Sequence, residues 1–169
     1  MNEPLHELLF GVRRSVRYHH RRRRFFDLLQ RITAGLAVVL GSTAVISLLQ
    51  QHPAIAVYAA LAVTFLSALD LVIGYAGMAR LHWDLARQFI ELEQDIVRGA
   101  DPDANTVAAW TARRLAIEAD EPPVLRVLDT LCHNELARAM GYDPRNYKRV
   151  GWFQAACAPF FDWRDSAIS

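Results

Sequence analysis

The sequence predicts an all-α integral membrane protein, in which a hairpin of two transmembrane helices carries a cytoplasmic helical bundle. Three observations predict it: two long apolar runs, an arginine-rich arm before the first run, and a helical apolar stripe after the second. The chain has 169 residues, of which 53% are hydrophobic and 22% are charged, so the apolar residues are concentrated in particular segments. We divide it into a basic cytoplasmic or interfacial helix (1–31), the hairpin (32–79) and a cytoplasmic helical domain (80–169).

The basic helix comes first. Residues 4–31 alternate apolar and basic side chains at helical spacing, and residues 1–31 hold eight arginines against three acidic residues. We expect this helix to lie along the membrane surface or to run directly into the first span. Four consecutive arginines, Arg21, Arg22, Arg23 and Arg24, are assigned to lipid headgroups and to setting the topology. Docking against acidic groups of the C-terminal part is an alternative, and a nucleic-acid partner is not expected.

The two apolar runs form the predicted hairpin. Residues 32–49 contain no charged residue, and residues 54–79 contain one. A helix needs roughly 20 apolar residues to cross about 30 Å of hydrocarbon, which places the spans at about 32–50 and 54–79. A cleaved signal peptide would begin nearer the N-terminus, and the remaining residues cannot easily cover two helices that are apolar all round.

Charge sets the expected orientation. The arginine-rich flank stays on the cytoplasmic side, whereas the connection at residues 50–53 has no Lys or Arg and can be translocated. We therefore expect both termini in the cytoplasm of a bacterium, with the hairpin in its inner membrane.

Small residues recur in both spans at spacings that let helix backbones approach closely in lipid. This packing can occur within one hairpin or between subunits, and both interpretations remain open. The residues are Ala37 and Gly41 in the first span and Ala60, Thr64, Ala68, Gly74 and Gly77 in the second.

Asp70 is the one charged residue inside a span. A carboxylate at the bilayer centre costs about 2.5–3.5 kcal/mol on insertion scales. Counting from the turn places Asp70 at the depth of Thr33 and Arg31. An ion pair with Arg31, a pore-lining or proton-sensing role in an oligomer, and snorkelling to the cytoplasmic surface are the three alternatives.

The second span is predicted to continue into the cytoplasm as one long helix that ends near Gly99. Its apolar stripe fits a partner helix or a coiled-coil seam and consists of Leu81, Leu85, Phe89, Leu92 and Ile96. Two further helices are expected, from Asn105 or Thr106 to Glu118 and from Pro122 to about Met140. The aromatic tail after residue 141 either docks on the membrane surface or packs under the bundle.

Signals of catalysis are weak. The segment His133-Asn134-Glu135 lacks the second histidine of a zinc-protease motif, and neither a glycine-rich phosphate loop nor a GxSxG sequence is present. Glu91, Glu93 and Asp95 are better explained as a solvated helix face than as metal ligands. We therefore expect no enzyme, no catalytic residue, no cofactor and no metal.

Several segments together resemble the SLATT group of small bacterial membrane proteins, which have two transmembrane helices and a cytoplasmic helical part. The similar segments are RYHHRRRRFFD, the charge-free first span with LGS, DLVIGYAGMARLHWDLARQFIELEQDI and LCHNELARAMG. The resemblance covers roughly residues 8–141. It implies a pore-forming effector of a conflict or phage-defence system, found in prophage-like neighbourhoods. Such effectors are commonly paired with a sensor domain, so we expect a separate protein or ligand to supply the trigger.

Two functional hypotheses follow. In the first, hairpins assemble as a homo-oligomer around a channel, with lipids and a separate sensor or trigger protein as partners. In the second, the spans are only an anchor, and the cytoplasmic helices form a non-conducting scaffold of prophage or cell-envelope origin. A transporter or membrane-bound enzyme subunit fits less well, because transporters need more spans with broken helices.

Overall fold

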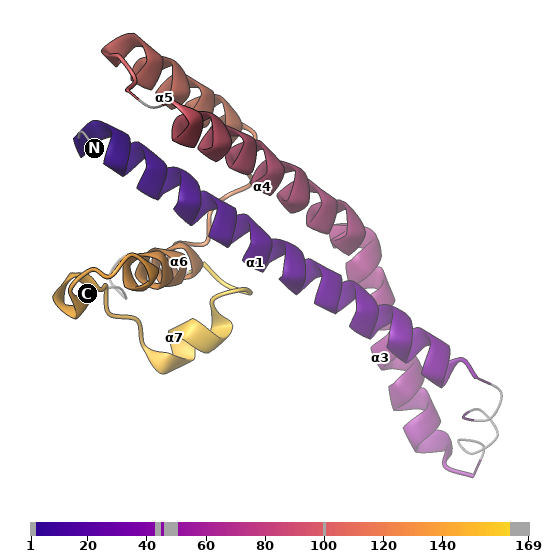
Figure 1. Ribbon diagram of the computed structural model, residues 1–169. Helices are drawn as coiled ribbons and strands as arrows, with labels where there is room; N and C mark the ends of the chain where they lie inside the picture. Colours follow the sequence, from indigo (N-terminus) through magenta and orange to yellow (C-terminus); the bar gives the residue numbers. More distant parts are fainter. Residues whose placement is uncertain (1–2, 43–44, 46–50, 100, 163–169) are drawn as a thin grey trace. The chain divides into compact units, whose positions relative to one another are not determined.

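The computed structural model describes residues 3–42, 45, 51–99 and 101–162. These residues form α-helices joined by short connections, with no strand among them, so the predicted all-α class is confirmed (Figure 1). The helices are α1 (Glu3–Leu40), α3 (Pro53–Ile73), α4 (Tyr75–Arg98), α5 (Ala104–Ala119), α6 (Arg126–Ala139), the 3-10 helix η1 (Pro144–Asn146) and α7 (Trp152–Cys157).

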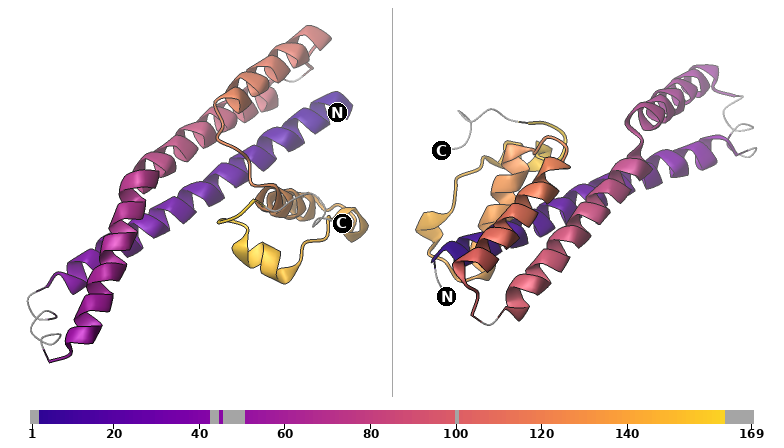
Figure 2. Two further views of the ribbon diagram at one scale, coloured as in Figure 1. Left: turned by 180° about the vertical axis from the view of Figure 1, so that it is seen from behind. Right: turned by 90° about the horizontal axis from the view of Figure 1, so that it is seen from above.

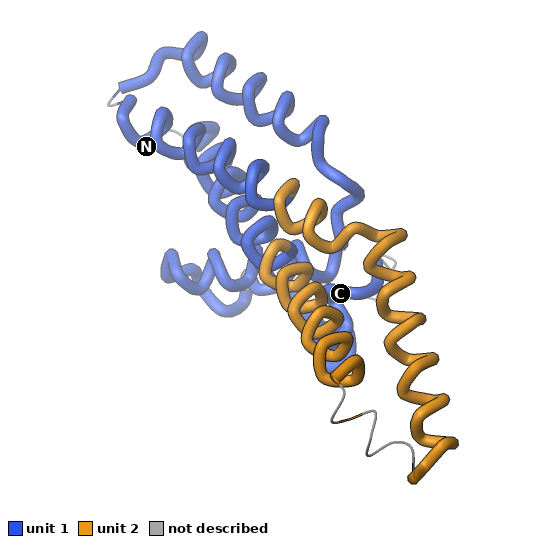
Figure 3. The backbone as a smooth tube through the Cα atoms, turned by 90° about the vertical axis from the view of Figure 1, so that its right-hand side faces the viewer, with its two compact units in different colours: residues 1–22, 82–169 blue, residues 23–81 orange. Residues whose placement is uncertain are grey.

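The chain divides into two compact units (Figure 3). Unit 1 joins Met1–Arg22 to His82–Ser169, and unit 2 is Arg23–Leu81. Helices α1 and α4 therefore each contribute one part to unit 1 and the other part to unit 2. The boundaries differ from the predicted segments, because residues 1–22 of the basic helix belong to the same unit as the C-terminal part of the chain.

In unit 1, the first half of α1 runs beside α4, and α5 packs against them (Figures 1 and 2). Apolar side chains at helical spacing on each helix meet in a shared core, and this burial is the main favourable contribution to packing. Phe89 of α4 lies at its centre and is fully buried. The core consists of Leu8, Leu9, Val12, Leu85, Phe89, Leu92, Ile96 and Ile117.

The C-terminal elements of unit 1 pack on α1 around Tyr18. This side chain is buried, and its hydroxyl accepts a hydrogen bond from the backbone N–H of Leu125 at 2.9 Å. Helix α6 begins at Arg126, so the predicted start at Pro122 is wrong. A residue before proline disfavours helical backbone, and the N–H of Leu125 is bound to Tyr18.

Helix α5 begins one residue before the predicted start. Asp103 is its N-cap, and its side chain accepts a hydrogen bond from the backbone N–H of Thr106 at 2.7 Å. Hydrogen bonding to the side chain of Thr106 and then to its backbone N–H lowers the pKa of Asp103. The backbone hydrogen bond also satisfies a donor that the helix itself leaves open.

In unit 2, the second half of α1 lies with α3 and the first turns of α4. Phe26, Tyr75 and Ala79 form a buried cluster, and the rings of Phe26 and Tyr75 stack with centroids 6.4 Å apart. Helix α3 contributes no buried residue.

The predicted continuous helix from the second span into the cytoplasm is interrupted at Gly74. Helix α3 ends at Ile73, Gly74 adopts a left-handed conformation with φ of 66°, and α4 begins at Tyr75. Glycine is the residue that takes this conformation without a steric penalty, so the sequence allows the break. Residues 75–79 belong to the same helix as the predicted cytoplasmic stripe and not to the span.

Candidate functional site

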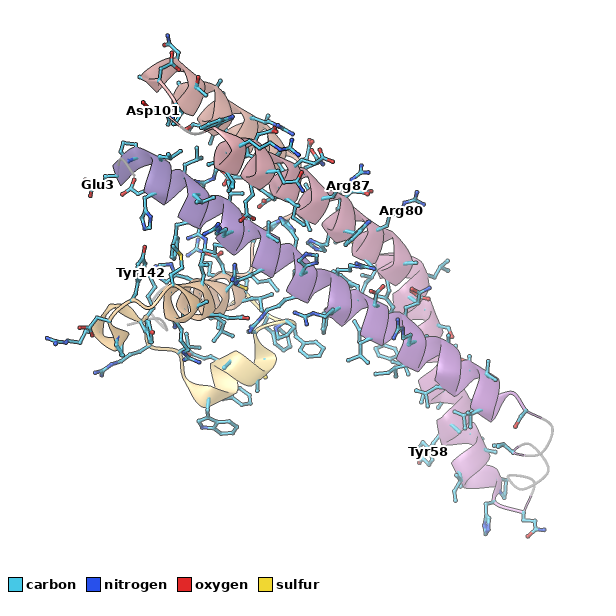
Figure 4. All side chains as sticks on the ribbon, in the orientation of Figure 1. Glu3, Tyr58, Arg80, Arg87, Asp101 and Tyr142 are labelled. Atoms are coloured by element: carbon cyan, nitrogen blue, oxygen red, sulfur yellow. The ribbon has the colours of Figure 1, made fainter. Side chains whose placement is uncertain are left out.

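Helix α3 is the one helix of the described residues that is long and apolar enough to cross a membrane, by length and composition. Its 21 residues span about 30 Å, and large apolar side chains such as Leu61 and Phe65 are more than 60% exposed. Tyr58 also projects from it and is 74% exposed (Figure 4). A core helix of a water-soluble protein would be covered. The other predicted span, 32–50, lies partly outside the described residues.

The predicted small residues contribute to a groove in unit 2. Its volume is about 610 Å³, and it lies between the end of α1 and the first half of α3. Ala37 of α1 and Gly41, which follows its last residue, line one side, and Ala60 and Thr64 line it from α3. Because these side chains are small, the groove stays open within one chain.

The remaining predicted small residues lie outside this groove. Ala68 and Gly77 are exposed, and a Cβ atom added to Gly77 would meet no atom within 4 Å. Gly74 is required by its backbone conformation and not by a close helix contact.

Asp70 lies at the break between α3 and α4. Its carboxylate oxygen Oδ1 accepts a hydrogen bond from the backbone N–H of Tyr75 at 3.2 Å, and its carbonyl accepts one from the N–H of Gly74 at 2.7 Å. A carboxylate at the first N–H groups of α4 also complements the helix dipole. Asp70 thus caps the second of the two helices.

The ion pair between Asp70 and Arg31, one of the predicted alternatives, is absent from the described residues. Arg31 is exposed, whereas Thr33 is 8% exposed. Neither side chain forms a hydrogen bond or ion pair with Asp70 among the residues that the structure describes. The free N–H groups created by the break at Gly74 attract the carboxylate instead.

The arginines of α1 in unit 1 contact acidic groups of α4 and α6. Arg13 pairs with Glu93 at 2.7 Å, and Arg21 pairs with Glu135 at 2.7 Å. Arg22 donates from Nη1 to the carbonyl oxygen of Pro159 at 2.6 Å. The ion pair favours the docking alternative for Arg21, whereas Arg22 binds a backbone carbonyl of the C-terminal part. The sequence assigned both to lipid headgroups.

The other two arginines of that cluster belong to unit 2. Arg23 pairs with Asp27 one turn later at 3.5 Å, and Arg24 is exposed. The assignment to lipid headgroups stays a prediction for these two.

The predicted stripe of α4 divides at the boundary between the units. Four of its members, Leu85, Phe89, Leu92 and Ile96, are buried in the core of unit 1. Leu81 is 37% exposed. The partner of the stripe within the chain is α1, together with α5.

A buried pair of histidines joins α1 to α4 inside unit 1. His19 is 0% exposed and His82 is 1% exposed, and their Nδ1 atoms are 2.9 Å apart. The other ring nitrogen of His19, Nε2, lies 3.0 Å from a carboxylate oxygen of Glu121, in the connection between α5 and α6. Phe89 stacks on the His19 ring. We call His19, His82 and Glu121 the histidine cluster.

The hydrogen-bond geometry of the histidine cluster determines which ring nitrogens carry a hydrogen. A carboxylate only accepts, so Nε2 of His19 donates to Glu121. In neutral His19 the Nδ1 atom then accepts, and Nδ1 of His82 donates to it. Burial, the neighbouring His19 and the Arg22 guanidinium lower the pKa of His82 to about 3. His82 is therefore neutral at physiological pH.

The histidine cluster was not predicted from the sequence. His19 stands within an arginine-rich run, His82 follows the first residue of the apolar stripe, and 63 positions separate them. The available signal was helical spacing, because His82 and Phe89 share a helix face two turns apart. Spacing could not show which α1 residue lies opposite.

No metal site is assembled in the described part of the chain. No group of three or more His, Cys, Asp or Glu side chains there is arranged to hold a metal ion. Cys132 is buried, and burial raises the pKa of its thiol to about 12. A thiol in this environment is a poor nucleophile, because the thiolate is the reactive form.

Comparison of the chain with family models, with curated proteins and with solved structures found no match.

Proposed function

We propose that unit 2 inserts into the inner membrane of a bacterium and that several copies of the chain associate there to form a channel. The observation that carries the proposal is α3, a predominantly apolar helix of 21 residues without a buried side chain. An apolar surface of this size is unfavourable in water, whereas the acyl chains of a bilayer provide an apolar environment for it.

The groove of unit 2 is the proposed contact between copies. Two spans cannot enclose a pore, so conduction requires several hairpins. The groove is lined by small residues of both helices, which lets another apolar helix approach closely. In this assembly, Asp70 lies at the end of α3 and influences ion passage, and both termini remain in the cytoplasm.

The proposed biological role is that of a pore-forming effector in a conflict or phage-defence system. It is supported by the resemblance to SLATT proteins and by the division of the chain into an apolar unit 2 and a charged unit 1. Unit 1 offers the surface on which a separate sensor or trigger protein acts. No enzyme activity, cofactor or metal is part of the proposal.

Filling the groove of unit 2 with a larger side chain tests whether copies of the chain associate through it to form a channel. Ala60→Leu places a larger side chain in it, and Ala62→Leu makes the same change at an exposed position of α3 outside the groove. We expect wild type and Ala62→Leu to form oligomers in lipid nanodiscs and to depolarise bacteria when expressed. Ala60→Leu is expected to lose both properties, because it blocks the close approach of helices.

Membrane potential is read with a voltage-sensitive dye at matched expression, and insertion is checked by resistance to alkaline extraction. A chain that inserts but stays monomeric in lipid contradicts the channel. Asp70→Asn then locates the conducting path, since a changed depolarisation places Asp70 on it and an unchanged one leaves Asp70 as a helix cap.

A non-conducting membrane-anchored scaffold is the second candidate. It is favoured by a groove of about 1040 Å³ in unit 1, between the start of α1, the end of α4 and α5. If it is correct, replacing residues 32–73 by an unrelated hairpin preserves function. Loss of function in that exchange, with unit 1 still folded, rules it out.

A further inference from the structure

Four large aromatic side chains of unit 1 are exposed at its C-terminal elements. Trp152 and Phe153 belong to α7, and Phe160 and Phe161 follow it. Their exposed fractions are 84%, 54%, 60% and 62%. We call these four residues the aromatic surface. The ring centroids of Trp152 and Phe153 are 5.8 Å apart and those of Phe160 and Phe161 are 6.4 Å apart, so the four rings form two adjacent-residue pairs. Exposed apolar side chains of this size on a folded unit indicate a site of interaction.

The same segment is held to unit 1 by its small residues and its backbone. Ala158 is fully buried in the cluster around Tyr18. The carbonyl of Pro159 accepts a hydrogen bond from Arg22, and the carboxylate of Asp162 accepts one from the N–H of Arg126 at 3.1 Å. Core packing ordinarily buries the large rings and exposes the alanine, and here the order is reversed.

Basic side chains precede the aromatic surface in the chain. Arg145, Lys148 and Arg149 are all exposed. The side chain of Asn134 fixes this stretch to α6, because it accepts from the N–H of Lys148 at 2.9 Å and donates to its carbonyl at 2.7 Å.

The acidic side chains of this stretch are already engaged locally. Asp143 pairs with Arg145 at 3.3 Å, and Asp162 is bound to the backbone of Arg126. Residues 143–162 hold three basic side chains, Arg145, Lys148 and Arg149, against two acidic ones, so the stretch keeps a net charge of +1.

We propose that the aromatic surface docks on the headgroup region of a bilayer that contains anionic lipids. Trp and Phe rings are favoured at the boundary between headgroups and acyl chains, and Lys and Arg are attracted to anionic headgroups. The inference rests on the proposed membrane insertion of unit 2, which keeps the chain at the bilayer. It adds a second membrane contact, made by unit 1.

Trp152 fluorescence tests this docking in the full chain. Replacing Trp83, Trp110 and Trp163 by Phe leaves Trp152 as the single tryptophan. In nanodiscs with one third phosphatidylglycerol, we expect bromine placed near the headgroups of labelled lipids to quench Trp152. Lys148→Gln with Arg149→Gln should reduce this quenching about twofold or more, because it removes the charge attraction. Arg87→Gln, an exposed charge on α4, is the control and should leave it unchanged.

A second measurement uses the unaltered chain. Trypsin cleavage after Lys148 and Arg149 should be slower in anionic nanodiscs than in phosphatidylcholine nanodiscs, since docking covers both side chains. Absence of lipid quenching in an inserted chain overturns the inference. Trp152 burial that depends on protein concentration, without lipid quenching, also overturns it and assigns the surface to a second copy. A chain removed from membranes by alkaline extraction contradicts the proposed function itself.

Discussion

His19 and His82 are two buried imidazole rings that share one hydrogen between their facing nitrogens. Tyr18, Arg22 and Glu121 are the other ionisable groups around them. Adding a proton to His82 introduces a second cation near Arg22 at a buried position. Such a group resists protonation in the folded state and accepts a proton readily once unfolded.

The stability of unit 1 should therefore depend on pH. The pKa of His82 is lowered from 6.5 to about 3 in the folded chain, so the unfolded chain binds one more proton between these values. The contribution of His82 to the free energy of unfolding is fully present above pH 6.5. Between pH 6.5 and about pH 3 it falls by about 1.4 kcal/mol for each pH unit. We expect a loss of about 2 kcal/mol at pH 5, measured by chemical unfolding in nanodiscs.

Two substitutions test this prediction: His82→Asn removes the titrating group, and His52→Asn is the control. His82→Asn retains a polar group at the position of Nδ1 and removes the titration, so its pH dependence should be flatter by most of that amount. His52→Asn changes an exposed histidine of unit 2 and should leave the dependence as in wild type. An unaltered slope in His82→Asn would show that another group titrates.

At the scale of elements, Gly74 decides whether α3 and α4 are two helices or one. A Cβ atom at residue 74 would meet no atom within 4 Å, so a substitution there is penalised by backbone conformation alone. Gly74→Ala should destabilise unit 2 by about 1 kcal/mol or more, because alanine disfavours a φ of 66°. Denaturation by SDS in lipid bicelles measures the change.

Gly77→Ala is the matched control in the same segment. Gly77 lies in the first turn of α4 with open space around it. Alanine is favoured over glycine in a helix, so this substitution should stabilise the unit by a few tenths to about 1 kcal/mol. Equal effects of the two substitutions would argue against the break at Gly74.

The apolar stripe of α4 provides a second test at this scale. Phe89→Ala should lower the free energy of unfolding of unit 1 by about 3–5 kcal/mol, because it empties a fully buried position. Leu81→Ala, at an exposed position of the same stripe, should cost less than about 1 kcal/mol. Chemical unfolding monitored by near-UV circular dichroism measures both, and similar losses would contradict the division of the stripe.

Some features of these elements can be predicted from the sequence, and others cannot. Helical spacing predicts α4 and its buried face, since Leu85, Phe89 and Leu92 repeat with the period of a helix. It cannot predict the break at Gly74, because glycine is common inside transmembrane helices and its φ depends on its surroundings. The contact between His19 and His82 is long-range, and a single sequence carries no signal for it. The capping role of Asp70 follows from the break and was missed with it.

For the whole molecule, the division into two units separates two kinds of stability. The core of unit 1 is formed by apolar side chains that pack on one another, whereas α3 has no buried residue and depends on its surroundings. Phe89→Ala should therefore weaken unit 1 and leave resistance to alkaline extraction unchanged. Loss of extraction resistance in that variant would show that the two units stabilise each other.

Because unit 1 is assembled from the two ends of the described chain, the ribosome makes its first helical segment long before the rest. Synthesis of the intervening unit 2 takes on the order of 3 to 12 s at about 5–20 residues per second. During that interval Leu8, Leu9 and Val12 have been synthesised, but α4, against which they pack, has not. The basic, apolar α1 is then an amphipathic helix that anionic lipid attracts. In the membrane-inserted protein proposed above, lipid would hold the start of α1 during this interval, and completion of unit 1 would then cover Leu8, Leu9 and Val12.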